Sequence, residues 1–406
     1  FTLTTAKQLL GFAELAKTYN FAGKTVKLGA DIELNEVDNT ILQAWKAGTQ
    51  VPASTWTPIG SATTPFAGTF DGQGYTISGL YLNATTESAG LFGTTVAAAV
   101  IKNFKLVDSY MKSTAVNLGI VGSGVLASME NIYTNAVMVS DTRCVAGFAG
   151  TLSSNGGTTY FKNCWFDGEV IQTKGSGDTY LAAGFLAQDG NAMMLEFDNC
   201  LSSGTVTGVS KVGGFMGWVN NYKAKNAEMF KNCLSVATVT ATGSADYCGS
   251  YFGQFNTSPY GLTMTKSYGV GSKINGVYRS QDGSYKTAIE SNTYIKTRDY
   301  LVEADETAIF PALTGETENA WAQDPYWNTS DRGTPILASF AEWWLDRQPT
   351  EGVFERIDTS WYDESKTEFT LTKVSEVLGI AQLSNEGKTF AGKTIKLGAD
   401  IVLNEV

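Results

Sequence analysis

Hydrophobic residues recur along the middle of the chain in short blocks bounded by small residues. The six blocks follow a Gly-apolar-apolar-Gly pattern, with Ala or Ser at one end of two of them: Gly90–Gly93, Gly119–Gly122, Gly147–Gly150, Gly184–Ala187, Gly214–Gly217 and Ser250–Gly253. The runs around them are short and rich in Val, Thr and Phe, which favours β-strands over helices. The pattern therefore predicts an all-β body of short strands and tight turns.

A second block follows most of the glycine blocks and carries an asparagine at a fixed place. These asparagines are Asn103, Asn131, Asn163, Asn199 and Asn232. They lie 28 to 36 residues apart, and repeats of about 20 to 50 residues indicate a solenoid, a propeller or an array. A four-stranded propeller blade usually needs about 40 to 50 residues, so the spacing favours a solenoid.

In a parallel β-solenoid, equivalent residues of successive coils lie about 4.8 Å apart. The five asparagines would then form a structural ladder, in which each side-chain amide bonds the next and satisfies polar groups at an inner corner. The residue after each asparagine would point into the core. We therefore predict a parallel β-solenoid, or β-helix, with an internal Asn ladder.

A much longer repeat spans the whole chain. Phe1–Thr4 returns as Phe369–Thr372, and Phe21–Ile32 returns almost unchanged as Phe390–Ile401. This predicts a tandem module with four segments: an N-terminal cap and first coil at 1–37, a solenoid body with a closing coil at 38–346, an inter-module linker at 347–368 and the start of a second copy at 369–406.

The module is expected to begin with a short helix over residues 6–17, capped by Thr4 or Thr5. Leu9, Phe12, Ala13 and Ala16 share one face of that helix, which would close the open end of the core. In the linker, the Trp361-Tyr362 pair would either dock on a neighbouring module or pack locally.

Composition narrows the classes of partner. The net charge is −11 and the pI is about 4.7, which argues against nucleic acid as a partner. There is no apolar run of about 18 residues, so we expect no membrane insertion. Histidine is absent, which removes the commonest general base and the commonest metal ligand.

The acidic residues predict no catalytic site. Asp71, Asp141, Asp167, Asp178, Asp189 and Asp198 are scattered singly, mostly in turn-like contexts. A glycosidase needs two carboxylates that face one groove, and no such cluster is evident across coils. We therefore predict that the protein is not an enzyme and has no cofactor. A bound calcium ion is left as an alternative, because backbone-dominated calcium sites leave little trace in a sequence.

A stripe of apolar and aromatic residues lies two positions after each asparagine. After Lys105 it comprises Tyr133, Trp165, Leu201, Leu234 and Tyr268. Strand alternation predicts that these side chains point outward, where they would contact a ligand or partner unless a loop or cap covers them. Trp218 and Tyr222 are secondary candidates.

Three of the five cysteines, Cys164, Cys200 and Cys233, occupy the same place in successive coils. A stacked column in a dry core would behave as small hydrophobic residues. A disulfide and a metal site are the alternatives.

Three segments resemble a known group of proteins. Gly213–Gly217 and Asn199–Val206 resemble the GLUG repeats of bacterial surface proteins, and Phe66–Leu80 resembles the coil that usually precedes them. The resemblance implies a right-handed β-helix of the pectate-lyase-like kind, in a large secreted or wall-attached, adhesin-like protein.

Taken with that resemblance, the repeats predict a non-catalytic extracellular structural or adhesive module that gives rigid reach and multivalent contact with glycan or protein ligands. Its expected partners are neighbouring copies of the same module. The alternatives are a β-helix carbohydrate-active enzyme, and a carbohydrate-binding module or filament-forming subunit.

Overall fold

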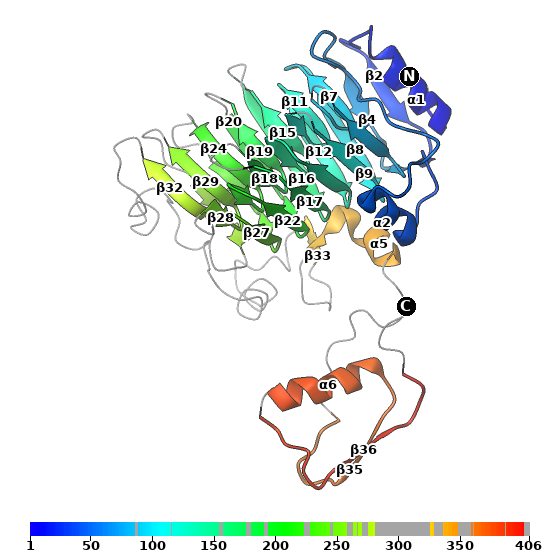
Figure 1. The fold of residues 1–406 in the computed structure, drawn as a ribbon, viewed down its shortest axis with the longest axis vertical. Helices are drawn as coiled ribbons and strands as arrows, with labels where there is room; N and C mark the ends of the chain where they lie inside the picture. Colours follow the sequence, from blue (N-terminus) through cyan, green and yellow to red (C-terminus); the bar gives the residue numbers. More distant parts are fainter. Residues whose placement is uncertain are drawn as a thin grey trace. The chain divides into compact units, whose positions relative to one another are not determined.

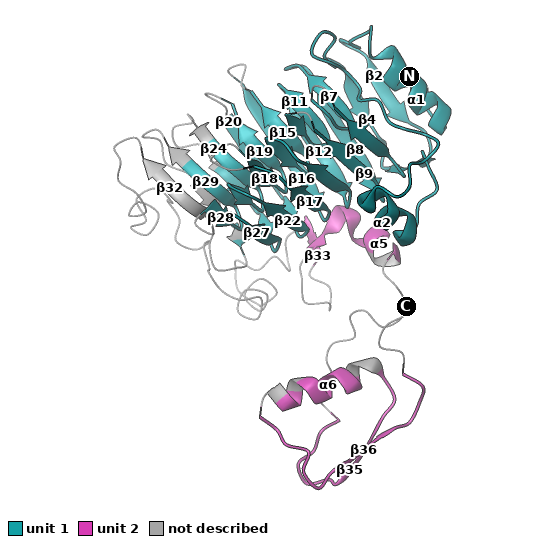
Figure 2. Cartoon of the chain, in the orientation of Figure 1, with its two compact units in different colours: residues 1–320 teal, residues 321–406 magenta. Residues whose placement is uncertain are grey.

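The computed structural model describes residues 1–280 with short gaps at 86–87, 115, 154–156, 176–179, 191–193, 223–227, 244–246, 258–262, 266 and 270–274. It also describes residues 325–328, 336–347, 359 and 361–401 except 386. The chain forms two compact units, residues 1–320 and 321–406, which are coloured separately in Figure 2 and are described one at a time.

Unit 1 is the predicted parallel β-solenoid (Figure 1). Four sheets run along it, each adding one strand per coil, and all their strand pairs in the described residues are parallel. Sheet I contains β1 (Thr2–Leu3), β2 (Thr25–Leu28), β4 (Thr69–Asp71), β8 (Val100–Val107), β12 (Ser128–Thr134), β16 (Thr158–Phe166), β20 (Met194–Asp198), β25 (Glu228–Lys231) and β30 (Thr263–Thr265). Shorter strands continue this sheet: β3 (Ile32–Glu33), β5 (Thr76–Ser78), β21 (Leu201–Ser202), β26 (Leu234–Ser235) and β31 (Tyr268–Gly269).

Three further sheets complete each coil. Sheet II contains β6 (Tyr81–Ala84), β9 (Tyr110–Ser113), β13 (Val137–Ser140), β17 (Glu169–Gln172), β22 (Thr205–Gly208) and β27 (Thr238–Ala241). Sheet III contains β10 (Asn117–Leu118), β14 (Cys144–Ala146), β18 (Leu181–Ala183), β23 (Val212–Gly213) and β28 (Cys248–Gly249). Sheet IV contains β7 (Phe92–Thr95), β11 (Val121–Gly124), β15 (Ala149–Leu152), β19 (Leu186–Asp189), β24 (Met216–Tyr222), β29 (Phe252–Thr257) and β32 (Asn275–Ser280).

The glycine blocks supply the core of the solenoid. In the last four blocks, the aromatic ring of each block stacks on the ring of the next coil: Phe148 on Phe185 at 4.5 Å, Phe185 on Phe215 at 4.7 Å, and Phe215 on Tyr251 at 4.8 Å between centroids. These side chains are fully buried. Burying a phenylalanine contributes up to about 3 kcal/mol, so the four stacked rings add substantially to core stability.

The N-terminal cap follows the prediction closely. Helix α1 (Ala6–Leu15) begins after Thr5, whose hydroxyl accepts a hydrogen bond from the Gln8 amide at 3.3 Å. The predicted face is buried, and Phe12 lies 6.2 Å from Phe70 of the first coil. The helix therefore closes the end of the core.

A second helix, α2 (Asn39–Ala47), lies within the segment where only solenoid was expected. Asp38 caps its N-terminus, accepting from the Ile41 amide at 2.7 Å, and Gly48 ends it in the left-handed conformation. Trp45 packs on Tyr81 of sheet II at 5.2 Å. The helix covers the outer face of the first coils of sheet II, beside β9 in Figure 1.

Unit 2 repeats the opening of unit 1. Strand β35 (Glu368–Leu371), helix α6 (Val374–Asn385) and strand β36 (Thr394–Leu397) follow the order β1, α1, β2. Thr2 pairs with Lys27 in the first copy, and the equivalent Thr370 pairs with Lys396 in the second. Unit 2 also contains the antiparallel pair β33 (Trp327–Asn328) and β34 (Ile336–Leu337), followed by α5 (Ala338–Arg347). Most of the expected linker lies outside the described residues.

Candidate functional site

The asparagine ladder has the predicted register, and three of its five members are joined in one run. Asn131 donates to Asn103 at 2.8 Å, and Asn163 donates to Asn131 at 3.0 Å. Asn232 donates to Asn199 at 2.7 Å in a second run. All five have φ between 53° and 60°, a left-handed conformation that asparagine tolerates better than most residues. The ladder therefore fixes a backbone corner in every coil. The side-chain oxygen of Asn163 is buried without a hydrogen-bond partner, so the two runs are separate.

Asp71, one of the scattered aspartates, ends this ladder. Its Oδ1 accepts from the Asn103 side chain at 2.9 Å and from the Gln73 amide at 3.1 Å. Burial alone would raise the pKa of Asp71, but these hydrogen bonds and the charge of Lys102 outweigh it and hold the pKa below its usual value. The carboxylate is thus kept ionised as a structural acceptor.

The predicted aromatic stripe has the expected register but not the expected exposure. Tyr133 lies opposite Trp165, which lies opposite Leu201, and Leu201 lies opposite Leu234. Tyr133 and Trp165 are only 3% and 1% exposed, and both leucines are fully buried. The expectation of an exposed ligand stripe is corrected for these four residues, because alternation sets the direction of a side chain and not what covers it. Leu234 lies opposite Tyr268, whose side chain is outside the described residues.

Two of the stripe residues belong to a polar network. The Tyr133 hydroxyl donates to Asp167 Oδ2 at 2.9 Å, and Ser203 Oγ donates to Asp167 Oδ1 at 2.6 Å. The Trp165 ring nitrogen donates to Ser203 Oγ at 2.7 Å. This network satisfies the polar ends of the rings, so Asp167 serves as an anchor for the stripe.

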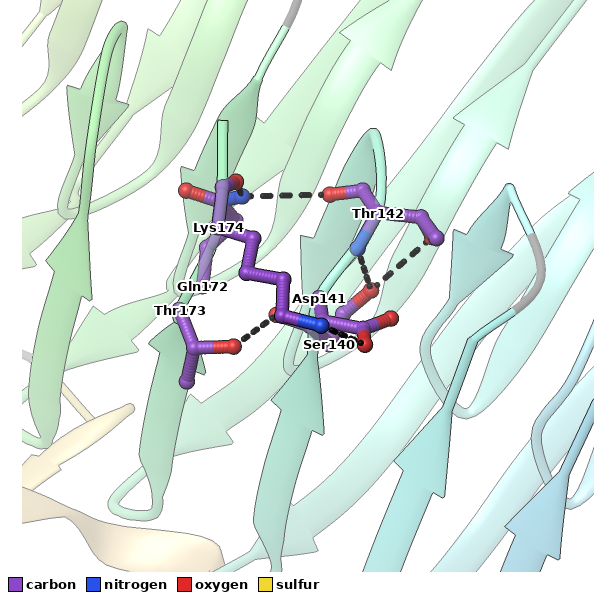
Figure 3. A network of polar contacts seen from close by, with 6 residues as sticks. All are labelled: Ser140, Asp141, Thr142, Gln172, Thr173 and Lys174. Atoms are coloured by element: carbon purple, nitrogen blue, oxygen red, sulfur yellow. Dashed lines mark hydrogen bonds and ion pairs between the residues drawn. The ribbon is translucent and has the colours of Figure 1, made fainter. Parts of the chain in front are cut away.

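Asp141 belongs to another structural network, drawn in Figure 3. It pairs with Lys174 at 3.2 Å. Beside it, the buried Gln172 side chain donates to the Thr142 carbonyl at 3.3 Å and to the Lys174 carbonyl, and it accepts from the Val209 amide at 3.0 Å. Gln172 thereby ties together the turns of three successive coils. Asp178 lies outside the described residues.

A column of alternating charges runs along sheet I and was not recognised in the sequence. Neighbouring strands place opposite charges side by side in the order Lys27, Asp71, Lys102, Glu130, Lys162, Asp198 and Lys231. A lysine separates every two carboxylates, so the column contains no adjacent carboxylate pair. Opposite charges on paired strands stabilise the sheet and disfavour a slipped register. In the sequence, this column could have been found from the alternating sign of the charged residue directly before each ladder asparagine.

Cys164, Cys200 and Cys233 form the predicted core column, and all five cysteines of the chain lie outside any disulfide. The Cys164, Cys200 and Cys233 sulfurs each donate to a core carbonyl at 3.4 Å. Burial raises the pKa of the Cys200 and Cys233 thiols well above the usual value. The described residues contain no group of three or more metal-ligating side chains, and no helix among them is long and apolar enough to cross a membrane.

The outward edges of sheets III and IV meet along a line of side-chain contacts that we call the polar seam. Thr151 donates to Asn117 at 2.8 Å, and Ser88 donates to Ser123 at 2.6 Å. Further along, Cys144 lies 3.7 Å from Gln188. Glycines within several sheet IV strands, such as Gly150 and Gly253, leave no room for a Cβ against sheet III, which brings the two rows of side chains together.

Trp218 lies at the last described coils of this seam. The Lys211 ammonium group is 3.7 Å from the centre of the Trp218 ring, although Lys211 is only 2% exposed. Gln254 lies opposite Trp218 in the next coil. The Trp218 ring nitrogen and Gln254 Oε1 are both buried without a hydrogen-bond partner. Lys211 and Gln254 are 2% and 1% exposed, so the half-buried Trp218 ring is the group of this trio that a ligand can reach, and Trp218 is the candidate contact residue. The Tyr222 side chain lies outside the described residues.

Comparison with known proteins supports the fold more than any function. No protein-family model matches the chain. Halomucin from Haloquadratum walsbyi is 30% identical over 133 residues, which are 32% of this chain and only 1% of that protein's length.

A solved structure with the same fold, a "putative immunoglobulin A1 protease from Bacteroides ovatus", matches with a TM-score of 0.52 and 17% identity, over 84% of this chain and 92% of that one. This neighbour overturns the expectation that the protein is not an enzyme, because a chain of the same fold bears the name of a protease. At this identity the likeness establishes the shared fold alone, and it identifies no catalytic residue in this chain.

Proposed function

We propose that the chain is a structural and adhesive module of a repetitive extracellular surface protein. The observation that carries this proposal is the repeat of strand, helix and strand in unit 2, with the pairing register of unit 1. Tandem copies of a stacked solenoid give reach, and repeated surfaces give many weak contacts that act together. The similarity of part of the chain to halomucin and the resemblance to GLUG repeats both support a surface location.

The contact site in this proposal is the Trp218 end of the polar seam. It offers the half-buried Trp218 ring, held against the Lys211 ammonium group on the inner strand β24 of sheet IV, and a fixed aromatic ring suits glycan or protein ligands. The buried stripe of Tyr133 and Trp165 offers no comparable surface.

Two experiments test the proposal. Electron microscopy of a protein with two complete modules should show straight rods, and compact or randomly bent particles would contradict the array. A polysaccharide panel should then be measured for retention and for newly formed chain ends in the same samples. Retention that is lost in Trp218→Ala, and kept in Tyr75→Ala, a control at an exposed ring elsewhere in unit 1, would support binding at the seam. New chain ends would instead identify an enzyme.

A further inference from the structure

The outer face of sheet I carries the column of alternating charges at a fixed spacing. Strands β2, β4, β8, β12, β16, β20 and β25 each contribute one charged residue, in the order Lys27, Asp71, Lys102, Glu130, Lys162, Asp198 and Lys231. Paired strands lie about 4.8 Å apart, so the sign of the charge reverses at every step of that length. A partner surface is complementary to this column only if its own charges alternate at the same step.

The outward positions beside the charges are small over the first four of these strands. Two residues before each charge lie Thr25, Thr69, Val100 and Ser128, and the larger Tyr160 and Glu196 follow on β16 and β20. Stacked sheets lie about 10 Å apart, and small residues beside the charges leave room for the side chains of a facing sheet. The face therefore allows the close approach of another sheet.

The charges of this face balance, unlike those of the whole chain. The chain carries 40 acidic and 29 basic residues, whereas the column contains four lysines and three carboxylates. Glu196 beside the column brings the number of carboxylates to four. Two copies of an acidic chain repel each other through most of their surfaces, so a balanced face is where a second copy meets the least repulsion.

The column is complementary to a copy of itself that runs in the opposite direction. A two-fold axis that lies across the strands, between β8 and β12, places every position opposite a residue of the other sign. The three pairs, each formed twice by the axis, are Lys102 with Glu130, Asp71 with Lys162, and Lys27 with Asp198. A two-fold axis along the column would instead place each charge opposite its own copy, which like-charge repulsion disfavours. The charges thus select one orientation.

We propose that this face of sheet I binds the same face of a second copy of the chain, with the two charge columns antiparallel. Such a contact is isologous, so it pairs two solenoids side by side and then closes. Exposed ion pairs are individually weak, and several in one register act together. The proposal goes beyond the tandem array and does not depend on it, because the tandem repeat joins modules end to end within one chain.

Sedimentation equilibrium of the full 406-residue chain tests the contact. At about 0.15 M salt, repulsion between the two acidic chains is screened beyond about 8 Å, and we expect a reversible dimer with a dissociation constant below about 1 mM. Raising the salt to about 1 M shortens the screening length to about 3 Å and should weaken the dimer about tenfold or more, because the contacts are ion pairs.

Two complementary variants test the register. Lys102→Glu places like charges at the centre of the dimer, and Glu130→Lys does the same with the opposite sign. Each variant alone should associate at least about tenfold more weakly than the natural chain. A mixture of the two should form a dimer of the original affinity, because the new acidic side chain of one variant then faces the new basic side chain of the other.

Two control variants change the net charge by the same amounts outside the column. Lys7→Glu and Glu36→Lys, both at exposed residues, should leave the dimer intact, and circular dichroism should show that all four variants are folded. A natural chain that stays monomeric up to about 1 mM, or a dimer that persists unchanged at high salt, would overturn the proposal. So would a mixture of the two column variants that fails to associate. None of these outcomes alters the rod-shaped particles expected in electron microscopy, so the two proposals can fail separately.

Discussion

Replacement of Asn131 by alanine tests whether the ladder stabilises the solenoid. Asn131 is the central member of the longer run: its side chain donates to Asn103 at 2.8 Å and accepts from Asn163 at 3.0 Å. Each lost hydrogen bond costs about 1 kcal/mol. The backbone at Asn131 has φ of 53°, and the strain of placing alanine in this left-handed conformation costs about 1 kcal/mol more. We expect Asn131→Ala to lower the free energy of unfolding by about 3 kcal/mol.

Asn131→Gly separates the two contributions. Glycine loses the same two hydrogen bonds but adopts a positive φ without strain, so we expect a loss of about 2 kcal/mol. Urea unfolding followed by circular dichroism gives both values. Since coils of a solenoid can unfold separately, amide hydrogen exchange in β12 and β16 should be measured in the same variants. A loss below about 0.5 kcal/mol in the alanine variant, or a glycine variant no milder than alanine, would refute this reasoning.

Three further predictions concern charge and reactivity. The pKa of Asp71 is lower in the folded protein than the value near 3.8 expected in the unfolded chain. Its carboxylate therefore adds stability at pH values above 3.8, and this contribution is lost as the pH falls through the lower folded pKa. Asp71→Asn should remove that part of the acid dependence of urea unfolding. Glu130→Lys places a like charge opposite Lys102 and Lys162 and should lower the free energy of unfolding by about 1 kcal/mol, a loss that added salt should reduce. Glu130→Gln should cost less. An equal loss of stability in both variants would argue against the charge column. The half-buried Cys248 should react first with a thiol reagent in the native protein, and rapid labelling of Cys164, Cys200 or Cys233 would contradict the dry cysteine column.

Much of the solenoid could be predicted from the sequence, because its stacking repeats one local pattern. The interval between ladder asparagines set the coil length, and the residue after each asparagine, such as Cys164, entered the core as expected. Side chains alternate across a strand, so the contents of one coil predict those of the next. The cap helix was predictable for a similar reason, since Thr5 and the apolar face of α1 lie within a few residues of one another.

The tertiary structure determined which outward-pointing side chains are exposed and which are covered. Strand alternation could not show that Trp165 and Leu201 are buried, because it sets the direction of a side chain and not its exposure. Helix α2 had recognisable caps at Asp38 and Gly48, but its place on sheet II follows from the contact of Trp45 with Tyr81. The charge column likewise exists only once the strand register is known. The repeat within the sequence thus determined the coil and its core, whereas the pairing of distant segments determined which surfaces remain open for contact.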